Sequence, residues 1–285
     1  MRYADQALYE NKAHKTDRLH FWTVYGERTP QRENEAQALL RNGGLRVFYQ
    51  PIMENRGRRI IGIEALARLQ DGDGRMLCPA EFLPLLTRDD LFQLSRRMLE
   101  QALLDLESLD QEQITLWVSI NIDPRNVSDA CIVYLQNRLT HAKITPQRIY
   151  LEILEGSNFE EQQLALDHLF TLKAHGVRLA LDDVGSAYSS LLRLRDLPID
   201  KVKLDQKFVQ ALEERPEDIQ FVESVLDLAN GLGLDLVVEG VETEDILDAM
   251  TALGVPSMQG YAIARPMPFS VLREFLRRPP RQYYE

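Results

Sequence analysis

The sequence has few cysteines, no long apolar run and no excess of basic residues. The two cysteines, Cys78 and Cys131, are too few for a disulfide framework, and neither belongs to a Cys-x-x-Cys zinc motif. No stretch reaches about 18 consecutive apolar residues, the length of a membrane span, and residues 1–5 do not open a signal-peptide core. These absences predict a soluble protein of the reducing cytoplasm.

The formal net charge is −11, which limits the kinds of ligand the protein can hold. A protein that grips a long nucleic acid needs a basic face to displace counterions, so this balance argues against that role. It does not exclude a small phosphorylated ligand, because clustered carboxylates can hold cations that contact the phosphate. The Gly-x-Gly-x-x-Gly turn of a doubly wound dinucleotide-binding sheet is also missing.

The order of the apolar runs predicts an α/β fold. Residues 1–23 predict a short helix and an extended piece, and residues 26–30 predict a linker. The predicted strands are Leu45–Gln50, Ile60–Leu66, Leu116–Asn121, Ile149–Ile153, Val177–Asp182, Lys201–Leu204, Leu236–Glu239 and Ser257–Gln259. The predicted helices include Glu33–Arg41, Leu91–Leu109, Glu161–Ala174, Glu217–Asn230 and Glu244–Leu253. The first two strands form a hairpin around residues 54–57, and the later β-α units favour a closed barrel, typically of about 250 residues.

Oxygen-bearing side chains stand at the ends of the predicted strands. They are Glu64, Asn121, Glu152, Asp182 with Asp183, Asp205 after Lys203, Glu239 and Gln259. The C-terminal ends of parallel barrel strands open onto one face, where active sites form, so these groups are expected to converge. Any one of them alone is more often a helix cap or a surface charge. Their recurrence at strand after strand favours a shared site.

Such convergence needs a cation. Crowded carboxylates repel one another and resist ionisation, and Mg²⁺ or Mn²⁺ removes this conflict because both prefer oxygen ligands. The adjacent pair Asp182-Asp183 is the best candidate for bridging two ions, which lie about 3.5–4 Å apart in sites for in-line displacement. Lys203 adds a positive charge that could orient a water or a developing oxyanion. The residues therefore predict metal-assisted hydrolysis of a phosphodiester.

Eight motifs follow one another between about residues 35 and 280. They are Phe48-Tyr49-Gln50-Pro51-Ile52, Glu64-Ala65-Leu66-Ala67-Arg68, Ser119-Ile120-Asn121-Ile122, Tyr150-Leu151-Glu152-Ile153-Leu154-Glu155, Leu181–Leu191, Pro198–Asp205, Glu239-Gly240-Val241-Glu242 and Gln259-Gly260-Tyr261. In residues, order and spacing, they resemble the motifs of EAL-domain cyclic di-GMP phosphodiesterases. A lone Glu-Ala-Leu would carry no weight, but the ordered set is specific. The resemblance implies a modified TIM (β/α)8 barrel with an antiparallel first strand. It also implies hydrolysis of cyclic di-GMP to linear 5′-pGpG with two Mg²⁺ or Mn²⁺ ions, by in-line attack of a metal-held water.

The resemblance further implies a role for each matching residue. The implied metal ligands are Glu64, Asn121, Glu152, Asp182 and Asp183, with Gln259 beside the metal water. The implied catalytic residues are Glu239 as general base or as ligand of the metal water, Lys203 at the catalytic water and Asp183 at the second ion. Arg68 would grip a substrate phosphate through its guanidinium fork, and the weaker cleft candidates are Gln50, Asp205, Glu242 and Pro266. Glu155 would anchor the long loop.

The long loop departs from the family pattern Asp-Asp-Phe-Gly-Thr-Gly. Val184 replaces the aromatic residue, Ser186 replaces threonine, and Ala187 removes backbone freedom if that position needs a positive φ. Leu69 and Asp123 replace a usual tryptophan and serine, but no implied metal ligand is lost. The family links this loop to metal-site integrity and dimerisation. The altered loop therefore leaves open an alternative function, a receptor that binds cyclic di-GMP without turning it over.

The first residues resemble a different domain. Residues 3–12 resemble the last helix of a GGDEF diguanylate cyclase domain. This predicts that residues 1–30 are the remnant of a preceding GGDEF-like domain and its linker, and that residues 31–285 form the EAL domain, which the family favours as a homodimer. A third function, an unrelated metal-dependent barrel enzyme such as an aldolase, would need a lysine or histidine base. Lys203 could serve, but none of the five histidines stands at a predicted strand end.

Overall fold

The computed structural model describes residues 29–123, 127–154, 163–185, 194–210, 212, 215 and 217–277. The predictions made for residues 1–28, for Glu155 and for the loop positions Ser186 and Ala187 lie outside the described residues.

Eight strands close into a barrel. They are β1 (Leu45–Glu54), β2 (Arg59–Gln70), β4 (Trp117–Ile122), β5 (Ile149–Leu154), β6 (Arg178–Val184), β7 (Lys201–Leu204), β8 (Asp235–Val238) and β9 (Ser257–Met258). The ring runs β1-β9-β8-β7-β6-β5-β4-β2, and the β1–β2 pairing closes it. Two short strands, β3 (Met76–Leu77) and β10 (Met267–Pro268), pair antiparallel with β2 and β1, respectively.

The first strand runs against the rest of the ring. β1 is antiparallel to both of its ring neighbours, β2 and β9, whereas every other neighbouring pair in the ring is parallel. The predicted barrel, the predicted hairpin and the antiparallel first strand are therefore confirmed. Because β2 and β4 to β9 are parallel to one another, their C-terminal ends all open at the same end of the ring.

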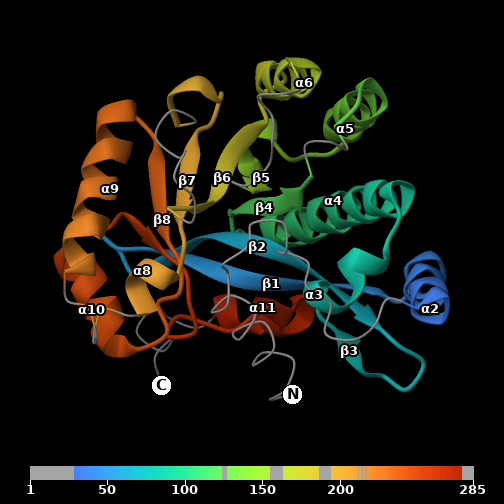
Figure 1. The fold of residues 1–285 in the computed structure, drawn as a ribbon, viewed down its shortest axis with the longest axis horizontal. Coiled ribbons are helices and arrows are strands. Elements are labelled where there is room, and N and C mark those ends of the chain that lie inside the picture. The colour runs from blue at the N-terminus through green and yellow to red at the C-terminus, as the bar shows by residue number, and fades with distance from the viewer. Residues whose placement is uncertain are drawn as a thin grey trace.

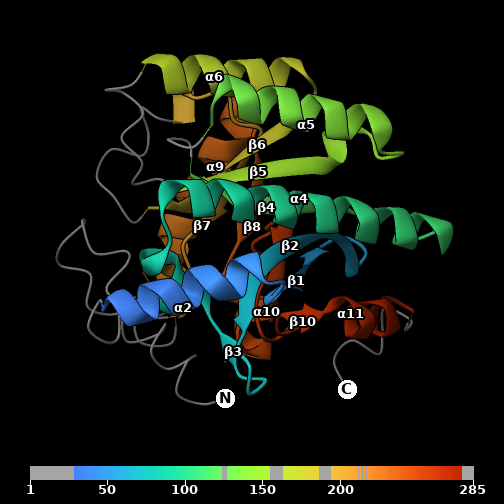
Figure 2. The ribbon, with the colours of Figure 1, turned by 90° about the vertical axis from the view of Figure 1, so that its right-hand side faces the viewer.

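Helices surround the ring (Figure 1). The longer ones are α2 (Pro30–Arg41), α4 (Arg88–Gln111), α5 (Asp129–His141), α6 (Gln163–Ala174), α9 (Asp218–Leu232), α10 (Glu244–Ala252) and α11 (Phe269–Leu276). The shorter ones are α3 (Pro79–Phe82), α8 (Lys207–Gln210) and the 3-10 turns η1 (Leu83–Leu85) and η3 (Pro146–Arg148). Figure 2 shows α4, α5 and α6 side by side on one flank, with α2 next to α4.

Local sequence signals explain where these helices begin. Thr87 caps α4 through a capping box with Asp90. The first turn of α4 also carries acidic residues, which suit the positive end of the helix dipole. Thr29 caps α2, and Pro30 occupies the first turn, where a missing N–H costs nothing. The helix therefore starts within the stretch predicted as a linker, three residues before the predicted start at Glu33.

The strands divide their side chains between two environments. Apolar residues of β4 to β8 such as Val118, Ile153 and Val202 belong to the buried core that the helices cover. Half of the buried polar side chains among the described residues come from the same strands, and Lys203 is the largest of those that are less than 2% exposed. A barrel strand alternates inward and outward residues, so the polar ones form an interior layer.

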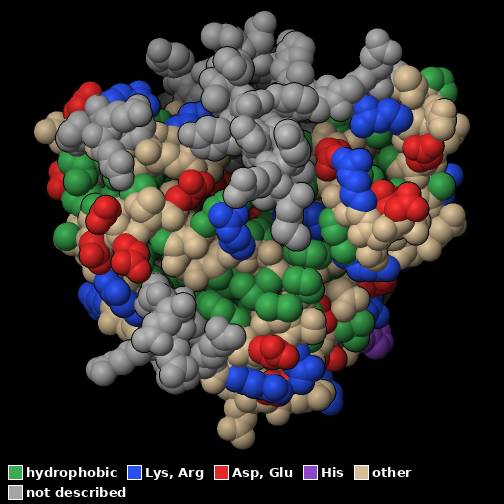
Figure 3. Space-filling model, turned by 90° about the horizontal axis from the view of Figure 1, so that it is seen from below, with side chains coloured by type: hydrophobic (Ala, Val, Ile, Leu, Met, Phe, Trp, Pro, Cys, Tyr) green, Lys and Arg blue, Asp and Glu red, His purple; other side chains and the backbone are tan. Residues whose placement is uncertain are grey.

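The surface carries charges of both signs. On the face seen in Figure 3, lysine and arginine side chains lie next to aspartate and glutamate side chains around a patch of apolar ones. None of the described helices combines the length and apolar character that a bilayer span requires.

Candidate active site

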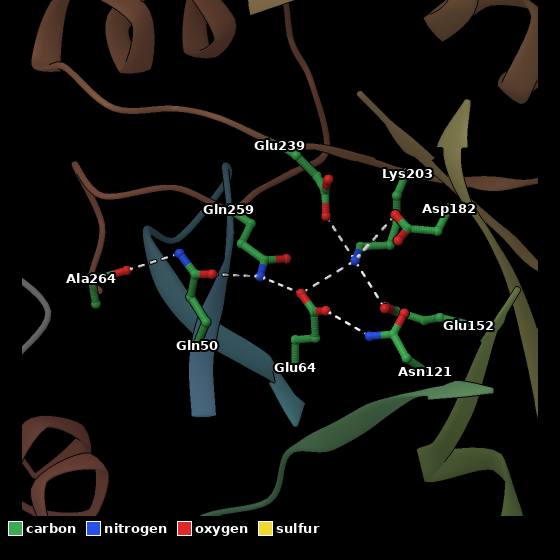
Figure 4. Close-up of polar contacts among 9 residues, drawn as sticks. All are labelled: Gln50, Glu64, Asn121, Glu152, Asp182, Lys203, Glu239, Gln259 and Ala264. Atoms are coloured by element: carbon green, nitrogen blue, oxygen red, sulfur yellow. Dashed lines mark hydrogen bonds and ion pairs between the residues drawn. The ribbon is translucent and has the colours of Figure 1, made fainter. Parts of the chain in front are cut away.

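Neighbouring strands deliver polar side chains to the C-terminal end of the barrel interior. Gln50 comes from β1, Glu64 from β2, Asn121 from β4, Glu152 from β5, Asp182 from β6 and Lys203 from β7, while Glu239 and Gln259 directly follow β8 and β9. The strand register places neighbouring side chains at similar levels along the barrel axis, because Gln50 pairs with Glu64 and Asn121 pairs with Glu152. Figure 4 shows these side chains pointing toward one another, so the predicted convergence at the strand ends is observed.

The ammonium of Lys203 lies at the centre of this group. Its Nζ lies 2.7 Å from Glu239 Oε1, 3.0 Å from Glu152 Oε2, 3.3 Å from Glu64 Oε2 and 3.5 Å from Asp182 Oδ1. The lysine side chain is only 1% exposed. Four carboxylates around one buried cation leave an excess of negative charge at the site. We call Glu64, Glu152, Asp182, Glu239 and Lys203 the carboxylate cluster.

The cluster controls the charge of its own lysine. Burial alone would lower the pKa of Lys203, but the four surrounding carboxylates hold that pKa well above its usual value. The ammonium is therefore charged at neutral pH. Lys203 can donate hydrogen bonds within the site, but it cannot serve as a base.

Glu64 and Glu152 differ in protonation behaviour although both are buried. Burial raises the pKa of Glu64, but Lys203 and hydrogen bonds from Gln259 and Asn121 lower it further, so the net shift is downward. The amide nitrogens lie 2.7 Å and 3.0 Å from the Glu64 oxygens. Burial raises the pKa of Glu152 well above its usual value, and Lys203 offsets this only in part. Glu64 is thus the anionic end of the cluster.

Asp182 and Asp183 are adjacent, yet both reach the same site. Consecutive residues of a regular strand point to opposite faces. Here the pairing of β6 with β7 shifts register between Leu181 and Val184, and Asp183 adopts a left-handed backbone with φ of 58°. This irregularity brings carboxylate oxygens of Asp182, Asp183 and Glu239 within 4.8 Å of one another.

An aromatic ring supports the turn that follows this pair. Gly185 has φ of 93°, and a Cβ added there would lie 2.6 Å from the ring of Phe208. Phe208 stacks on Phe221 with ring centroids 4.1 Å apart. Val184, which replaces the aromatic residue of the family pattern, is buried in the core. Glycine is required at 185 both for the backbone angle and for the close approach of Phe208.

The donor set fits a divalent cation. Its oxygens come from carboxylates and from amide side chains, which are the ligands that Mg²⁺ and Mn²⁺ prefer. Gln259 is 3% exposed, and its Oε1 has no hydrogen-bond partner among the described residues. A buried carbonyl oxygen without a donor is unfavourable, so this atom also points to a missing partner at the site.

The candidates for substrate contact are spread around this centre. Arg68 is half-buried, donates to the main-chain oxygen of Ala67 at 2.8 Å and lies over the ring of Phe48. Glu242 is exposed and accepts a hydrogen bond from Gln210 at 2.7 Å. Pro266 is half-buried in the segment between β9 and β10.

Two further candidates have partners within the protein. Asp205 is fully buried, accepts from the Lys207 main-chain nitrogen and pairs with the Lys207 ammonium at 3.1 Å. In this structure, the Asp205 carboxylate holds the turn that leads into α8. Gln50 contacts Gln259 and the main-chain oxygen of Ala264.

A second buried lysine, Lys201, lies on the same strand as Lys203 and was not predicted from the sequence as a site residue. Lys201 Nζ lies 3.3 Å from the ring centroid of Trp117 and 3.9 Å from that of Tyr150. Burial lowers the pKa of Lys201 to about 7. Lys201 stands two residues before Lys203 on β7, as Tyr150 stands two residues before Glu152 on β5. This period of two was the available signal, because it places both lysines on the inner face.

Comparisons with known proteins agree with this geometry. The sequence profile of the EAL domain family matches residues 33–266. Cyclic di-GMP phosphodiesterase RocR of Pseudomonas aeruginosa is 34% identical over 231 residues, which cover 80% of this chain and 59% of that protein. The bifunctional diguanylate cyclase/cyclic di-GMP phosphodiesterase MucR of the same organism is 30% identical over 272 residues, 93% of this chain and 40% of that protein. The chain therefore spans less than two thirds of the length of these relatives.

Solved structures share the fold. A structure described as PaMucR phosphodiesterase in complex with c-di-GMP superposes with a TM-score of 0.77 at 31% identity and covers 85% of this chain and 99% of that one. An EAL domain protein of Listeria monocytogenes gives a TM-score of 0.72 at 26% identity, over 87% of this chain and 98% of that one. The overall fold is thus shared with structures of known EAL domains.

Proposed function

The chain belongs to the EAL domain family, and we propose that it hydrolyses one phosphodiester bond of cyclic di-GMP to give linear 5′-pGpG. Relatives named cyclic di-GMP phosphodiesterases support this function, as does the similar structure solved in complex with c-di-GMP. The observation that carries the proposal is the carboxylate cluster around the buried ammonium of Lys203, at the C-terminal end of the parallel strands. Carboxylates repel the phosphates of an anionic substrate, so such a substrate can bind there only together with cations that contact both.

The proposed holders of the cations are residues of the cluster and its neighbours. Glu64, Asn121, Glu152 and Asp182 would hold one Mg²⁺ or Mn²⁺ ion, and Asp182 with Asp183 would hold a second, with Gln259 alongside. Such ions neutralise phosphate charge and make water acidic enough to supply a nucleophile at neutral pH. The left-handed Asp183 supports a pair of ions, because it turns both adjacent carboxylates toward the site.

The protein side chains have separate tasks in the proposed reaction. A water oxygen attacks phosphorus in line with the bond between phosphorus and the 3′ oxygen, and that bond breaks. Glu239 is partly exposed and lies 2.7 Å from Lys203, so its carboxylate is placed to accept the proton from the water. Lys203 remains charged and donates hydrogen bonds, which orients the water and stabilises negative charge in the transition state. The departing 3′ oxygen takes a proton from solvent.

The substrate would be gripped outside the cluster. Arg68 stands four residues after Glu64 on β2, so its guanidinium is suited to a phosphate oxygen at the rim. Glu242 and Pro266 would line the cleft for the guanine groups, and Glu155 would anchor the loop that follows β5. Asp205 is the weakest of these candidates, because its carboxylate is buried against Lys207.

Product analysis tests the function directly. The purified chain is incubated with cyclic di-GMP and Mg²⁺ or Mn²⁺, with a chelator control, and the nucleotides are separated by chromatography. We expect 5′-pGpG with either metal and none with the chelator. Tight binding of cyclic di-GMP without product would establish the receptor alternative instead. Neither binding nor product would refute both functions.

The wider arrangement is also proposed. We infer that residues 1–30 are the end of a GGDEF-like domain and its linker, that residues 31–285 form the EAL domain, and that the domain acts as a homodimer in the cytoplasm. The bifunctional relative supports the tandem arrangement, because its match covers 93% of this chain but only 40% of that protein. A longer version of the chain that synthesises cyclic di-GMP from GTP would test the first part, and sedimentation would test the dimer.

A further inference from the structure

A chain of amide hydrogen bonds crosses from β1 to the carboxylate cluster. Gln50 Nε2 donates to the main-chain oxygen of Ala264 at 3.2 Å, and Gln50 Oε1 accepts from Gln259 Nε2 at 3.2 Å. Gln259 Nε2 also donates to Glu64 Oε2 at 2.7 Å. Figure 4 shows the four groups in a row, leading from Ala264 to Glu64. We call Ala264, Gln50 and Gln259 the amide relay.

The direction of the relay is fixed by its first member. A main-chain carbonyl can only accept, so Gln50 must turn its NH₂ toward Ala264 and its carbonyl oxygen toward Gln259. Gln259 must then offer its NH₂ to Gln50. The second hydrogen of that NH₂ points to Glu64 Oε2 at 2.7 Å, and this carboxylate oxygen accepts it.

This arrangement leaves one atom of Gln259 uncommitted. Both hydrogens of its NH₂ are used, so Oε1 must face away from Gln50 and Glu64. Among the described residues, Oε1 has no hydrogen-bond partner, although Gln259 is 3% exposed. A reversed amide would place the carbonyl oxygen against the Glu64 carboxylate, where two acceptors repel.

The anchor of the relay is rigid. The Ala264 nitrogen donates to the Gly260 oxygen at 3.0 Å, and the Val241 nitrogen donates to the Gln259 oxygen at 3.1 Å. The Gly260 backbone packs so closely on Val241 that an added Cβ would lie 2.0 Å from the Val241 oxygen. Any other residue at 260 would force these segments apart, so the position of the Ala264 carbonyl is set by the backbone.

We propose that Gln50 is a positioning residue, which fixes the side-chain amide of Gln259 so that its carbonyl oxygen faces the carboxylate cluster. There, the oxygen accepts from water or binds a divalent cation. This role rests on the proposed metal-dependent function, and it differs from a role of Gln50 in lining the nucleotide cleft. A positioning role acts before any nucleotide binds, whereas a cleft-lining role acts only on the nucleotide.

Metal binding without nucleotide separates the two roles. We compare wild type, Gln50→Met, Gln259→Met and the double variant by calorimetric titration with Mn²⁺ alone. Gln101→Met is the matched control, because Gln101 also donates to a carboxylate, Asp105, but on α4 away from the site. We expect Gln50→Met to weaken Mn²⁺ binding about tenfold, as loss of a group that orients a ligand does. Gln101→Met is expected to match wild type.

The double variant tests whether Gln50 acts through Gln259. If it does, adding Gln50→Met to Gln259→Met weakens Mn²⁺ binding by less than twofold further, because the oriented group is already gone. In turnover assays, Gln50→Met should lower kcat and raise the Mn²⁺ requirement. A cleft-lining residue would instead raise KM for cyclic di-GMP and leave Mn²⁺ binding intact. Gln50→Leu repeats the measurement if Gln50→Met does not fold.

Two outcomes overturn the proposal, and they have different consequences. If wild type binds Mn²⁺ and Gln50→Met binds it within twofold as well, the positioning role is wrong and the proposed function stands. If wild type itself binds no Mn²⁺, the proposed metal-dependent function is wrong, and the proposed role of Gln50, which depends on it, is wrong as well.

Discussion

Replacing Lys203 with methionine removes the only cation inside the carboxylate cluster and keeps nearly the same side-chain volume. Four carboxylate oxygens lie within 3.5 Å of the Lys203 ammonium, and the side chain is 1% exposed. Removing one partner of a buried ion pair costs about 3–5 kcal/mol, because the remaining charge is left uncompensated. At about 2–4 °C per kcal/mol for a domain of this size, the melting temperature without metal should fall by about 6–20 °C near pH 8.

The loss should depend on pH in a defined direction. In wild type, the lowered pKa of Glu64 contributes stability above the pKa of the unfolded chain, and this contribution disappears as the pH falls. The raised pKa of Lys203 contributes stability at every pH below its unfolded value of about 10.4. Without the ammonium, the carboxylates can relieve their repulsion by binding protons. The difference between Lys203→Met and wild type should therefore shrink toward about pH 5.

Thermal unfolding followed by circular dichroism in a chelator gives the comparison at both pH values. Lys173→Met is the control, because Lys173 pairs with Asp200 at 3.1 Å in a partly exposed position, where an ion pair contributes only about 0–1 kcal/mol. Mn²⁺ should raise the melting temperature of Lys203→Met more than that of wild type, because the ion replaces the missing charge. If Lys203→Met is no less stable than Lys173→Met near pH 8, or if the loss is equal at both pH values, the electrostatic account of the cluster is wrong.

Three other substitutions test separate parts of the site. Glu64→Ala should lower turnover of cyclic di-GMP to background in the chromatographic assay, since Glu64 joins Lys203 to both amide side chains; near-normal turnover would remove it from the metal site. Glu239→Gln should keep nucleotide binding in a filter assay and slow hydrolysis by about 10²-fold or more, and an unchanged rate would reject Glu239 as the base. Gly185→Ala should cost about 1–3 kcal/mol in chemical denaturation, because alanine is strained at φ of 93° and collides with Phe208; unchanged stability would show that the turn can relax.

Much of the fold could be predicted from the sequence because most strands are short apolar runs that alternate with longer helical patterns. The run Lys201–Leu204 forms β7 as predicted, and the ends of most other predicted strands lie within a few residues of the observed ends. β2 continues to Gln70, four residues beyond the predicted end, because it pairs there with β1 and with β3. β3 and β10 have two residues each, and such short pairings carry no periodic signal.

The residues of the site could be predicted, but their contacts could not. The strand ends identify Glu64, Glu152 and Lys203 as neighbours because parallel strands end together. The sequence gives no indication that the ammonium of Lys203 touches four carboxylates, because this depends on side-chain reach across the barrel. The turning of Asp183 toward Asp182 depends on a register shift, which a period of two does not predict.

The antiparallel first strand joins the beginning of the barrel to its end. β1 is the only member of the ring that bonds to the end of the domain, through β9 and β10, as well as to β2. Gln50 lies on β1 and Gln259 directly follows β9, so the joint between the two ends of the domain includes the hydrogen bond between their side-chain amides. A small shift of β1 along its axis would change the geometry of this bond, because Gln50 is carried on β1 itself. The closure of the barrel and the orientation of the Gln259 amide therefore depend on the same joint, between β1 and the segment that includes β9.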